Sequence, residues 1–330
     1  MSCNEAELFI VGTSVDPHID AVLQRLDGKV STCRLDVDQY PENSKVSIDI
    51  KGGVVDAKVC DRFGNQWDVS HPKVLWFRRL GKPGLKHLSS DYKEFSLGEI
   101  EQTIEGLLSV INPIHKINGI WETRLASNKI RQYLFAAKSG LITPHTLISN
   151  SPEDSKSWLR TEDSVAKSLS RPVLTTEASE IGKTFVYTNR VTSADIRNAG
   201  QIAAVPVQFQ RLIKPEYELR VTSFRGEHHV VAIKSSDIHS NRIDWRATAT
   251  ECKYWATRLS STTSMQLTHM MKLLRLDFAA SDFIVDNRGQ EWFLESNPNG
   301  AWLWLEAFVD EFKFTDRLAR QISELITGSK

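Results

Sequence analysis

The spacing of apolar residues predicts an α/β fold for the first third of the chain. Leu8–Val11 is a short apolar run, and apolar residues then recur at helical spacing over His18–Leu26, which indicates a strand followed by a helix. Ser47–Asp61 alternates between apolar and polar residues around a Gly-Gly turn, and Val74–Phe77 is a second apolar run. We expect these strands to lie in one sheet.

Changes in the pattern predict where the domains meet. A helical period runs over Tyr92–Ile111 and ends at Asn112-Pro113, which favours a first boundary near residue 120. The next clear helix, Ser127–Gly140, has Ser127 or Asn128 as its cap. Its apolar face is formed by Ile130, Tyr133, Leu134 and Ala137. The strand Val207–Ile213 is expected to open the last domain, so the predicted domains are 1–120, 121–205 and 206–330.

Composition then excludes several classes of function. Lys plus Arg and Asp plus Glu each number 41, so no net positive charge attracts nucleic acid or an anionic membrane. The four cysteines form no C-x-x-C pair, which disfavours structural zinc and a disulfide framework and favours the cytoplasm. The sequence shows no secretory signal, and no apolar run approaches the roughly 18 residues of a membrane span.

The most informative chemistry lies in the last predicted hairpin, residues 278–296. If a two- or four-residue loop joins its strands, Asp282 lies opposite Glu295, and Asn297 shares their face. Such oxygen ligands fit Mg²⁺. A three-residue loop without a bulge would instead put the carboxylates on opposite faces, and a solvated strand face is the alternative interpretation.

Other candidate residues are interpreted as structural. Arg78-Arg79 follows a predicted strand and is interpreted as a solvated basic pair. Trp302 and Trp304 are interpreted as packing residues at the rim of any site. The chain contains neither H-E-x-x-H nor G-x-S-x-G, which disfavours the common hydrolase classes.

Taken in order, these segments resemble the ATP-grasp ligases. The most similar members are the graspetide synthetases, microviridin-type enzymes that close ester or amide macrocycles on ribosomally made precursor peptides. The resemblance spans nearly the whole chain, including Leu75–Arg79 and Asn118–Trp121. It rests on Asn128-Lys129, Lys167, Gln208-Phe-Gln210, Glu218-Leu-Arg220, Asp244-Trp-Arg246, Asp282 and the segment Leu294–Trp302.

This resemblance implies a pre-ATP-grasp α/β domain followed by central and C-terminal domains that grip ATP between them. It implies ATP and Mg²⁺ as cofactors, a precursor peptide with a leader and an acidic core as partner, and a homodimer. Asp244 and Arg246 correspond to the element that engages the core peptide, with Arg246 suited to pairing a substrate carboxylate. Ala301 is a departure, since related sequences often carry a larger polar residue there.

The resemblance also implies roles at the nucleotide. Phosphate contacts fall to Lys129 and Lys167, and Arg220 would reach the transferring phosphoryl group. Gln210, Arg211 and Leu212 would contact adenine, and Glu218 would contact the ribose. The magnesium ligands would be Asp282, Glu295 and Asn297.

The implied reaction is an ATP-dependent carboxylate ligation. An Asp or Glu side chain of the peptide takes the γ-phosphoryl group, and a Thr or Ser hydroxyl or a Lys amine attacks the acyl phosphate. Two alternatives stay open: a ligase that adds amino acids to a small molecule or a protein tail, and a non-catalytic peptide-binding module.

Overall fold

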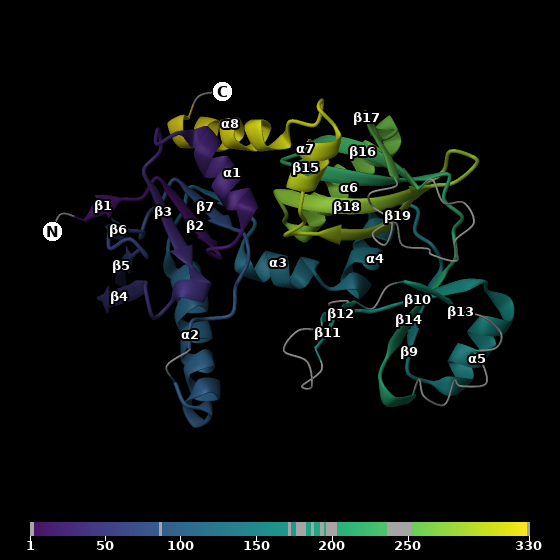
Figure 1. The fold of residues 1–330 in the computed structure, drawn as a ribbon, viewed down its shortest axis with the longest axis horizontal. Coiled ribbons are helices and arrows are strands. Elements are labelled where there is room, and N and C mark those ends of the chain that lie inside the picture. The colour runs from purple at the N-terminus through teal and green to yellow at the C-terminus, as the bar shows by residue number, and fades with distance from the viewer. Residues whose placement is uncertain are drawn as a thin grey trace.

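The computed structural model shows three groups of sheets (Figure 1). The N-terminal part lies on one side of the molecule, and the central sheet lies below the C-terminal sheet on the other side. The mixed α/β architecture predicted from the sequence is confirmed. The structure describes residues 3–85, 88–170, 173–175, 183–185, 188–191, 195, 203–235 and 252–328.

A parallel sheet of order β3-β2-β7-β8 forms the core of the N-terminal part. Both faces are covered, which is why its central strands β2 and β7 are continuous apolar runs. Leu8 and Ile10 pack with helices α1 and α8, and Phe9 and Val11 pack with α2. The elements are β2 Leu8–Gly12, α1 Pro17–Leu26, β3 Thr32–Asp36, a 3₁₀ turn η1 Val37–Gln39, β7 Val74–Phe77, α2 Ser90–Val110 and β8 His115–Ile117.

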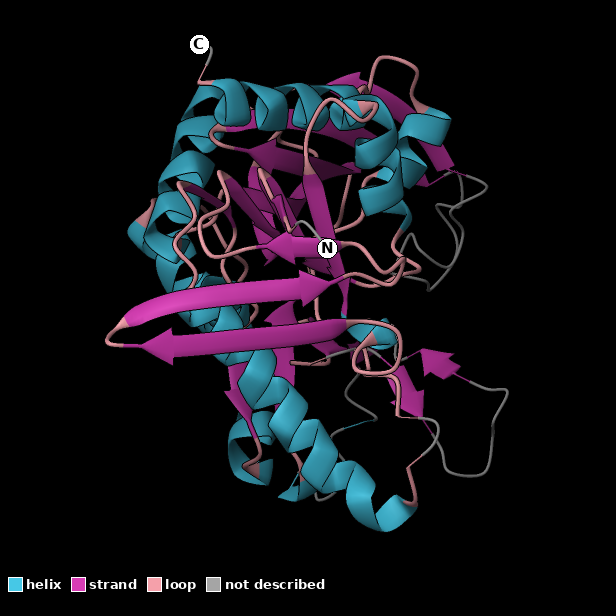
Figure 2. Cartoon of the chain, turned by 90° about the vertical axis from the view of Figure 1, so that its left-hand side faces the viewer, coloured by secondary structure: helices cyan, strands magenta, loops and turns pink. Residues whose placement is uncertain are grey.

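The predicted hairpin around Gly52-Gly53 is present, but its placement in the same sheet as β7 was wrong. Its strands form a separate sheet of order β1-β6-β5-β4, seen as the long hairpin at the front of Figure 2. Strand β4 is exposed at alternate positions, a pattern that does not suit a parallel sheet covered on both faces. The strands are β1 Asn4–Glu5, β4 Lys45–Lys51, β5 Val54–Cys60 and β6 Gln66–Asp68.

The central sheet is antiparallel, with the order β13-β10-β14-β9. Strand β14 was expected to open the C-terminal domain, but it pairs with β10 and β9 instead. Hydrophobic pattern defines a strand and not its neighbours, so the sheet could only be assigned from the structure. The elements are β9 Thr146–Ser149, α5 Pro152–Thr161, β10 Ser164–Lys167, β11 Val173–Thr175, β12 Lys183–Phe185, β13 Asn189–Val191 and β14 Val207–Arg211.

The C-terminal sheet has the order β17-β16-β15-β18-β19 and is antiparallel. Helix α6 packs on one face through Leu267, Met270, Met271 and Leu274, which recur at helical spacing and are buried. The elements are β15 Tyr217–Phe224, β16 Glu227–Ser235, β17 Cys252–Thr257, α6 Ser261–Leu274, β18 Phe278–Val285, β19 Glu291–Asn297, α7 Leu303–Phe308 and α8 Phe314–Thr327.

Two helices connect parts that are distant in sequence. Helix α8 lies beside α1 and packs on the N-terminal sheet (Figure 1). Helix α4 (Lys129–Lys138), which follows α3 (Ile120–Ala126), packs against α6 and β19. Its buried residues are Gln132 and Ala136, whereas Ile130 and Leu134 are 55% and 54% exposed, so the predicted apolar face was wrong.

No helix among the described residues is long and apolar enough to span a membrane.

Candidate active site

The β18–β19 hairpin places Asp282 directly opposite Glu295, as predicted. The loop has three residues, rather than the two or four for which this facing was counted, because Asp286 N–H donates to the Gln290 carbonyl at 3.1 Å. The register shifts between Asp282 and Phe283, so that Leu294 is an extra residue in β19. This bulge restores the pairing that a regular three-residue hairpin would have lost.

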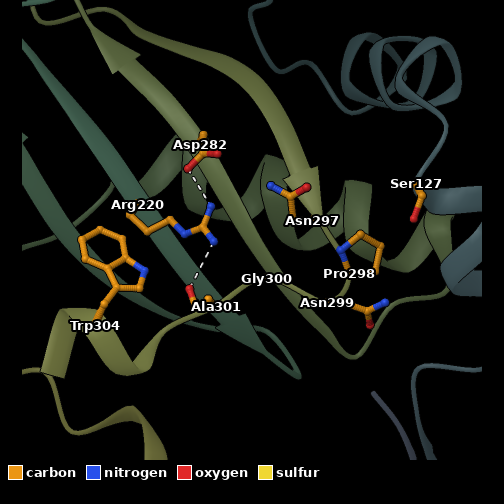
Figure 3. A pocket seen from close by; sticks show the side chains of 9 residues that line it. All are labelled: Ser127, Arg220, Asp282, Asn297, Pro298, Asn299, Gly300, Ala301 and Trp304. Carbon is orange, nitrogen blue, oxygen red and sulfur yellow. Dashed lines mark hydrogen bonds and ion pairs between the residues drawn. The ribbon is translucent and has the colours of Figure 1, made fainter. Parts of the chain in front are cut away.

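Strand β15 adds a cation to this carboxylate pair. Arg220 lies opposite Asp282 across the sheet, and its Nη1 donates to Asp282 Oδ1 at 2.8 Å while Nη2 donates to the Ala301 carbonyl at 3.2 Å. Figure 3 shows this guanidinium between the two acceptors, with Trp304 beside it. The pocket is lined by Ser127, Arg220, Asp282, Asn297, Pro298, Asn299, Gly300, Ala301 and Trp304.

Lys129 connects the hairpin to the central sheet. Its Nζ lies 3.1 Å from Glu295 Oε2 and donates to the Ser168 carbonyl at 3.0 Å. Ser168 follows Lys167, whose Nζ donates to Gln210 Oε1 at 2.8 Å. The two lysines predicted to bind phosphate are therefore connected, because Lys129 contacts the residue that follows Lys167.

Gln210 belongs to a buried polar network on β14. Its Nε2 donates to Tyr133 Oη at 3.3 Å and to Thr146 Oγ1 at 3.1 Å, and Gln208 Nε2 donates to Tyr133 Oη at 2.6 Å. Burial raises the pKa of Tyr133 to about 12, and the nearby charge of Glu295 adds to the effect. The phenol therefore stays protonated and can hold both amides in fixed orientations.

The remaining predicted nucleotide residues lie at the end of β14 in the central sheet and on β15 in the C-terminal sheet. Arg211 N–H donates to the His145 carbonyl at 2.9 Å, and Leu212 N–H donates to the Asp163 carbonyl at 2.8 Å. Glu218 is half-buried on β15, two residues from Arg220 and thus on the same face. Asp244 and Arg246 lie outside the described residues.

Two buried polar side chains, for which the sequence predicted no role of this kind, hold the backbone around the site. Gln132 accepts from Ser296 N–H at 2.9 Å and donates to the Ser296 and Ala126 carbonyls, each at 2.7 Å. Asn118, with a left-handed φ of 52°, donates to the Phe278 and Pro298 carbonyls at 2.8 and 3.0 Å. The only sequence signal for such residues is a polar side chain in an otherwise apolar environment.

Arg78 corrects the interpretation of a solvated basic pair. It is 1% exposed, its Nε lies 3.3 Å from Asp16 Oδ2, and Nη2 donates to the Gly300 carbonyl at 3.1 Å. The expected packing role of Trp302 is confirmed, since it is fully buried against Phe278. Trp304 lies at the pocket, as expected.

The oxygen ligands present fit magnesium held together with a nucleotide. No three His, Cys, Asp or Glu side chains form a metal-binding group among the residues that the structure describes. Asp282 and Glu295 supply two carboxylates, and Asn297 adds an amide whose Nδ2 lies 3.4 Å from Glu295 Oε1. Mg²⁺ commonly takes one or two carboxylates and completes its shell with water and phosphate oxygens.

Comparison with known proteins places this arrangement among known folds, beginning with the part of the chain that contains the parallel sheet. The family model described as the MvdD pre-ATP grasp domain matches residues 8–124. The chain therefore begins with a pre-ATP-grasp domain of this type, and the predicted resemblance to ATP-grasp ligases is confirmed.

Solved structures extend the similarity to the whole chain. The macrocyclase MdnC of Microcystis aeruginosa, bound with the precursor peptide MdnA, is 28% identical, with 98% of this chain and 100% of that chain covered and a TM-score of 0.84. A RiPP-associated ATP-grasp ligase of Chryseobacterium gregarium, in complex with ADP and a leader and core peptide, is 23% identical, with 99% and 97% covered and a TM-score of 0.86. No curated protein matches the chain.

A second Microcystis aeruginosa structure and a more distant one complete the comparison. The macrocyclase MdnB is 25% identical, with 97% of this chain and 99% of that chain covered and a TM-score of 0.77. D-alanyl-alanine synthetase A of Vibrio cholerae is 14% identical with a TM-score of 0.56, and 99% of each chain is covered. Among these structures, the chain is more similar to the two macrocyclases and the RiPP-associated ligase than to the D-alanyl-alanine synthetase.

Proposed function

We propose that this protein is an ATP-dependent ligase that activates Asp or Glu side chains of a ribosomal precursor peptide. The activated carboxylates would then close ω-ester or ω-amide macrocycles with Thr or Ser hydroxyls or Lys amines. The observation that carries the proposal is the Arg220–Asp282–Glu295 grouping, which lies in a chain similar along its length to the macrocyclase MdnC.

The three-domain division belongs to this proposal. We keep the first boundary, between residues 120 and 121. The second boundary was expected between residues 205 and 206, and strand pairing supports a different position. Because β14 pairs with β9 and β10, the last boundary moves to the segment after Arg211. ATP would then lie between the central sheet and the C-terminal sheet, where Lys129 reaches both.

Asp282, Glu295 and Asn297 are the residues that would hold magnesium. Bound Mg²⁺ would offset the negative charge of the phosphate oxygens. In the present arrangement Arg220 and Lys129 neutralise the two carboxylates, whose mutual repulsion at facing strand positions would otherwise be costly. The same cations can turn to phosphate oxygens when a nucleotide arrives.

Nucleotide contacts are assigned along β10, β14 and β15. Lys167 lies beside Gln210 and is proposed to bind phosphate as a point charge. Gln210, Arg211 and Leu212 are proposed for adenine, and since two of their backbone N–H groups already donate to other carbonyls, other groups of this segment would meet the base. Glu218 is proposed for the ribose hydroxyls.

Arg220 and Arg246 are proposed for the chemical steps. A substrate carboxylate oxygen attacks the γ-phosphorus and ADP leaves; the hydroxyl or amine then attacks the acyl carbon and phosphate leaves. Arg220, held by two acceptors, would offset the charge that develops on the transferring group. Arg246, with Asp244, is proposed to bind the substrate carboxylate, which a planar guanidinium can pair through two hydrogen bonds.

Intact mass spectrometry tests this function. The protein is incubated with ATP, Mg²⁺ and the acidic precursor peptide encoded beside its gene, and Glu295→Gln serves as the matched inactive control. Each ring should lower the peptide mass by one water. ADP release with an unchanged peptide mass would favour a ligase that uses an external nucleophile, and no ADP release would favour a peptide-binding module.

A further inference from the structure

The backbone that follows strand β19 is held mainly by side chains from outside the β18–β19 hairpin. We call residues 298–302 the pocket loop, because Pro298, Asn299, Gly300 and Ala301 line the pocket. Four described side chains contact its backbone at 3.0–3.2 Å: Asn118 at the Pro298 carbonyl, Arg78 at the Gly300 carbonyl, Arg220 at the Ala301 carbonyl and His18 at the Trp302 N–H.

Three of these side chains, Asn118, His18 and Arg78, come from the N-terminal domain of residues 1–120, and His18 and Arg78 are linked to each other. His18 follows the cap of α1, and its Nε2 accepts the Trp302 N–H at 3.2 Å. Its Nδ1 lies 2.9 Å from Asp16 Oδ1, and a carboxylate can only accept there. The contacts therefore require a neutral ring with its proton on Nδ1, and burial lowers the pKa of His18, which favours this form.

Asp16 joins His18 to Arg78. The Asp16 side chain is 1% exposed and faces both His18 and the buried Arg78 guanidinium. Burial by itself would raise the pKa of Asp16, but the hydrogen bond from His18 and the charges of Arg78 and Arg79 hold it well below its ordinary value. Arg78 also stacks over Trp302, with Cζ 5.0 Å from the ring centroid. A charged, buried group of this kind is fixed tightly by its partners.

Displacement of the pocket loop would also move the Arg220 side chain. A Cβ at Gly300 would lie 2.2 Å from Ala280 Cβ and 2.9 Å from Arg220 Nη2, so the loop backbone already packs as closely as glycine allows. The adjacent Ala301 carbonyl is one of the acceptors that orient the guanidinium. A shift of a few tenths of an ångström therefore changes the position of Arg220 as well.

We propose that His18, Asp16 and Arg78 are positioning residues, through which the N-terminal domain fixes the pocket loop and thereby the orientation of Arg220. The N-terminal domain then acts on the chemical step without touching the reacting groups. The catalytic meaning of this inference rests on the proposed function, whereas the positioning contact itself does not.

The test compares His18→Leu with His18→Gln, whose amide oxygen can still accept the Trp302 N–H. Arg25→Met is the matched control, because Arg25 also joins α1 to the C-terminal segment, through an exposed pair with Asp316 at 2.7 Å, but contacts no residue of the pocket loop in the described structure. Amide hydrogen exchange is measured by mass spectrometry on peptides covering residues 298–305. Peptide-dependent ADP release is measured in parallel.

His18→Leu should raise exchange in this segment about tenfold, as expected for a buried N–H that loses its partner. It should lower kcat about tenfold with little change in KM for ATP, and His18→Gln should recover most of both. If His18→Leu fails to fold, Arg78→Lys replaces it, because lysine keeps the charge beside Asp16 and loses the guanidinium fork that also reaches Gly300.

Unchanged exchange in residues 298–305, or an equal change in Arg25→Met, would overturn the inference whatever the turnover. A rise in KM with kcat unchanged would also overturn it, because that result would indicate lost nucleotide binding. If the wild-type protein releases no ADP, the proposed function is wrong, and the exchange data still decide whether the N-terminal domain holds the pocket loop.

Discussion

Gln132→Met is predicted to loosen the strand that carries Glu295 and Asn297. Strand β19 is an edge strand, and the Gln132 amide takes the place of a further strand by pairing with both backbone groups of Ser296. A third hydrogen bond reaches the Ala126 carbonyl. Methionine has a similar length and no amide, so it preserves the packing and leaves three buried backbone groups without this partner.

The magnitude follows from these three hydrogen bonds. At about 1 kcal/mol for each lost bond, local stability should fall by roughly 3 kcal/mol, which corresponds to about 100-fold faster exchange of the Ser296 amide. Because Ser296 lies between Glu295 and Asn297, the affinity for Mg²⁺ and ADP should fall as well. A single free energy of unfolding would average over several domains, which is why a local measurement is preferable.

The assay is hydrogen exchange on peptides spanning residues 291–297, with strand β2 as an internal reference. Gln102→Met on the exposed face of α2 is the matched control, because it makes the same chemical change without a buried partner. Ser296 protection within about threefold of wild type in Gln132→Met would refute the reasoning, since at least two of the three bonds would then contribute almost nothing.

Three further predictions concern the site and its support. Glu295→Gln should abolish ATP-dependent turnover and leave the circular dichroism spectrum unchanged, because it removes the charge of a proposed magnesium ligand and keeps the shape. Residual turnover above about 10% would contradict the proposed role of Glu295. Gly300→Ala should lower kcat at least tenfold, because the added methyl group would lie 2.2 Å from Ala280 Cβ. A wild-type kcat in this variant would contradict the prediction, because it would show that the pocket loop can move to accept the methyl group. Burial lowers the pKa of His18 from its ordinary value of 6.5. Below pH 6.5, His18 therefore binds more protons in the unfolded chain than in the folded protein, and the stability of the fold decreases as the pH falls. Denaturant midpoints from pH 7.5 to 5 should therefore decrease more in wild type than in His18→Leu, and parallel decreases would count against this prediction.

The sequence predicted several of the strands and helices, among them β2, α1 and β7, because periodicity depends only on local spacing. It also predicted the β18–β19 hairpin and the facing of Asp282 and Glu295. The facing of these carboxylates was counted for a two- or four-residue loop, and it holds with the observed three-residue loop because the bulge at Leu294 compensates. A register count from a turn is therefore informative only when bulges are considered as well.

Only the tertiary structure decided what each element packs against. It placed β14 in the central sheet, turned Ile130 and Leu134 of α4 toward solvent, and buried Arg78 beside Asp16. These outcomes depend on partners that are far apart in the chain, and local spacing carries no information about them. The sequence thus predicted the chemical groups of the site, whereas long-range packing decided how Gln132, His18 and Arg78 hold them in place.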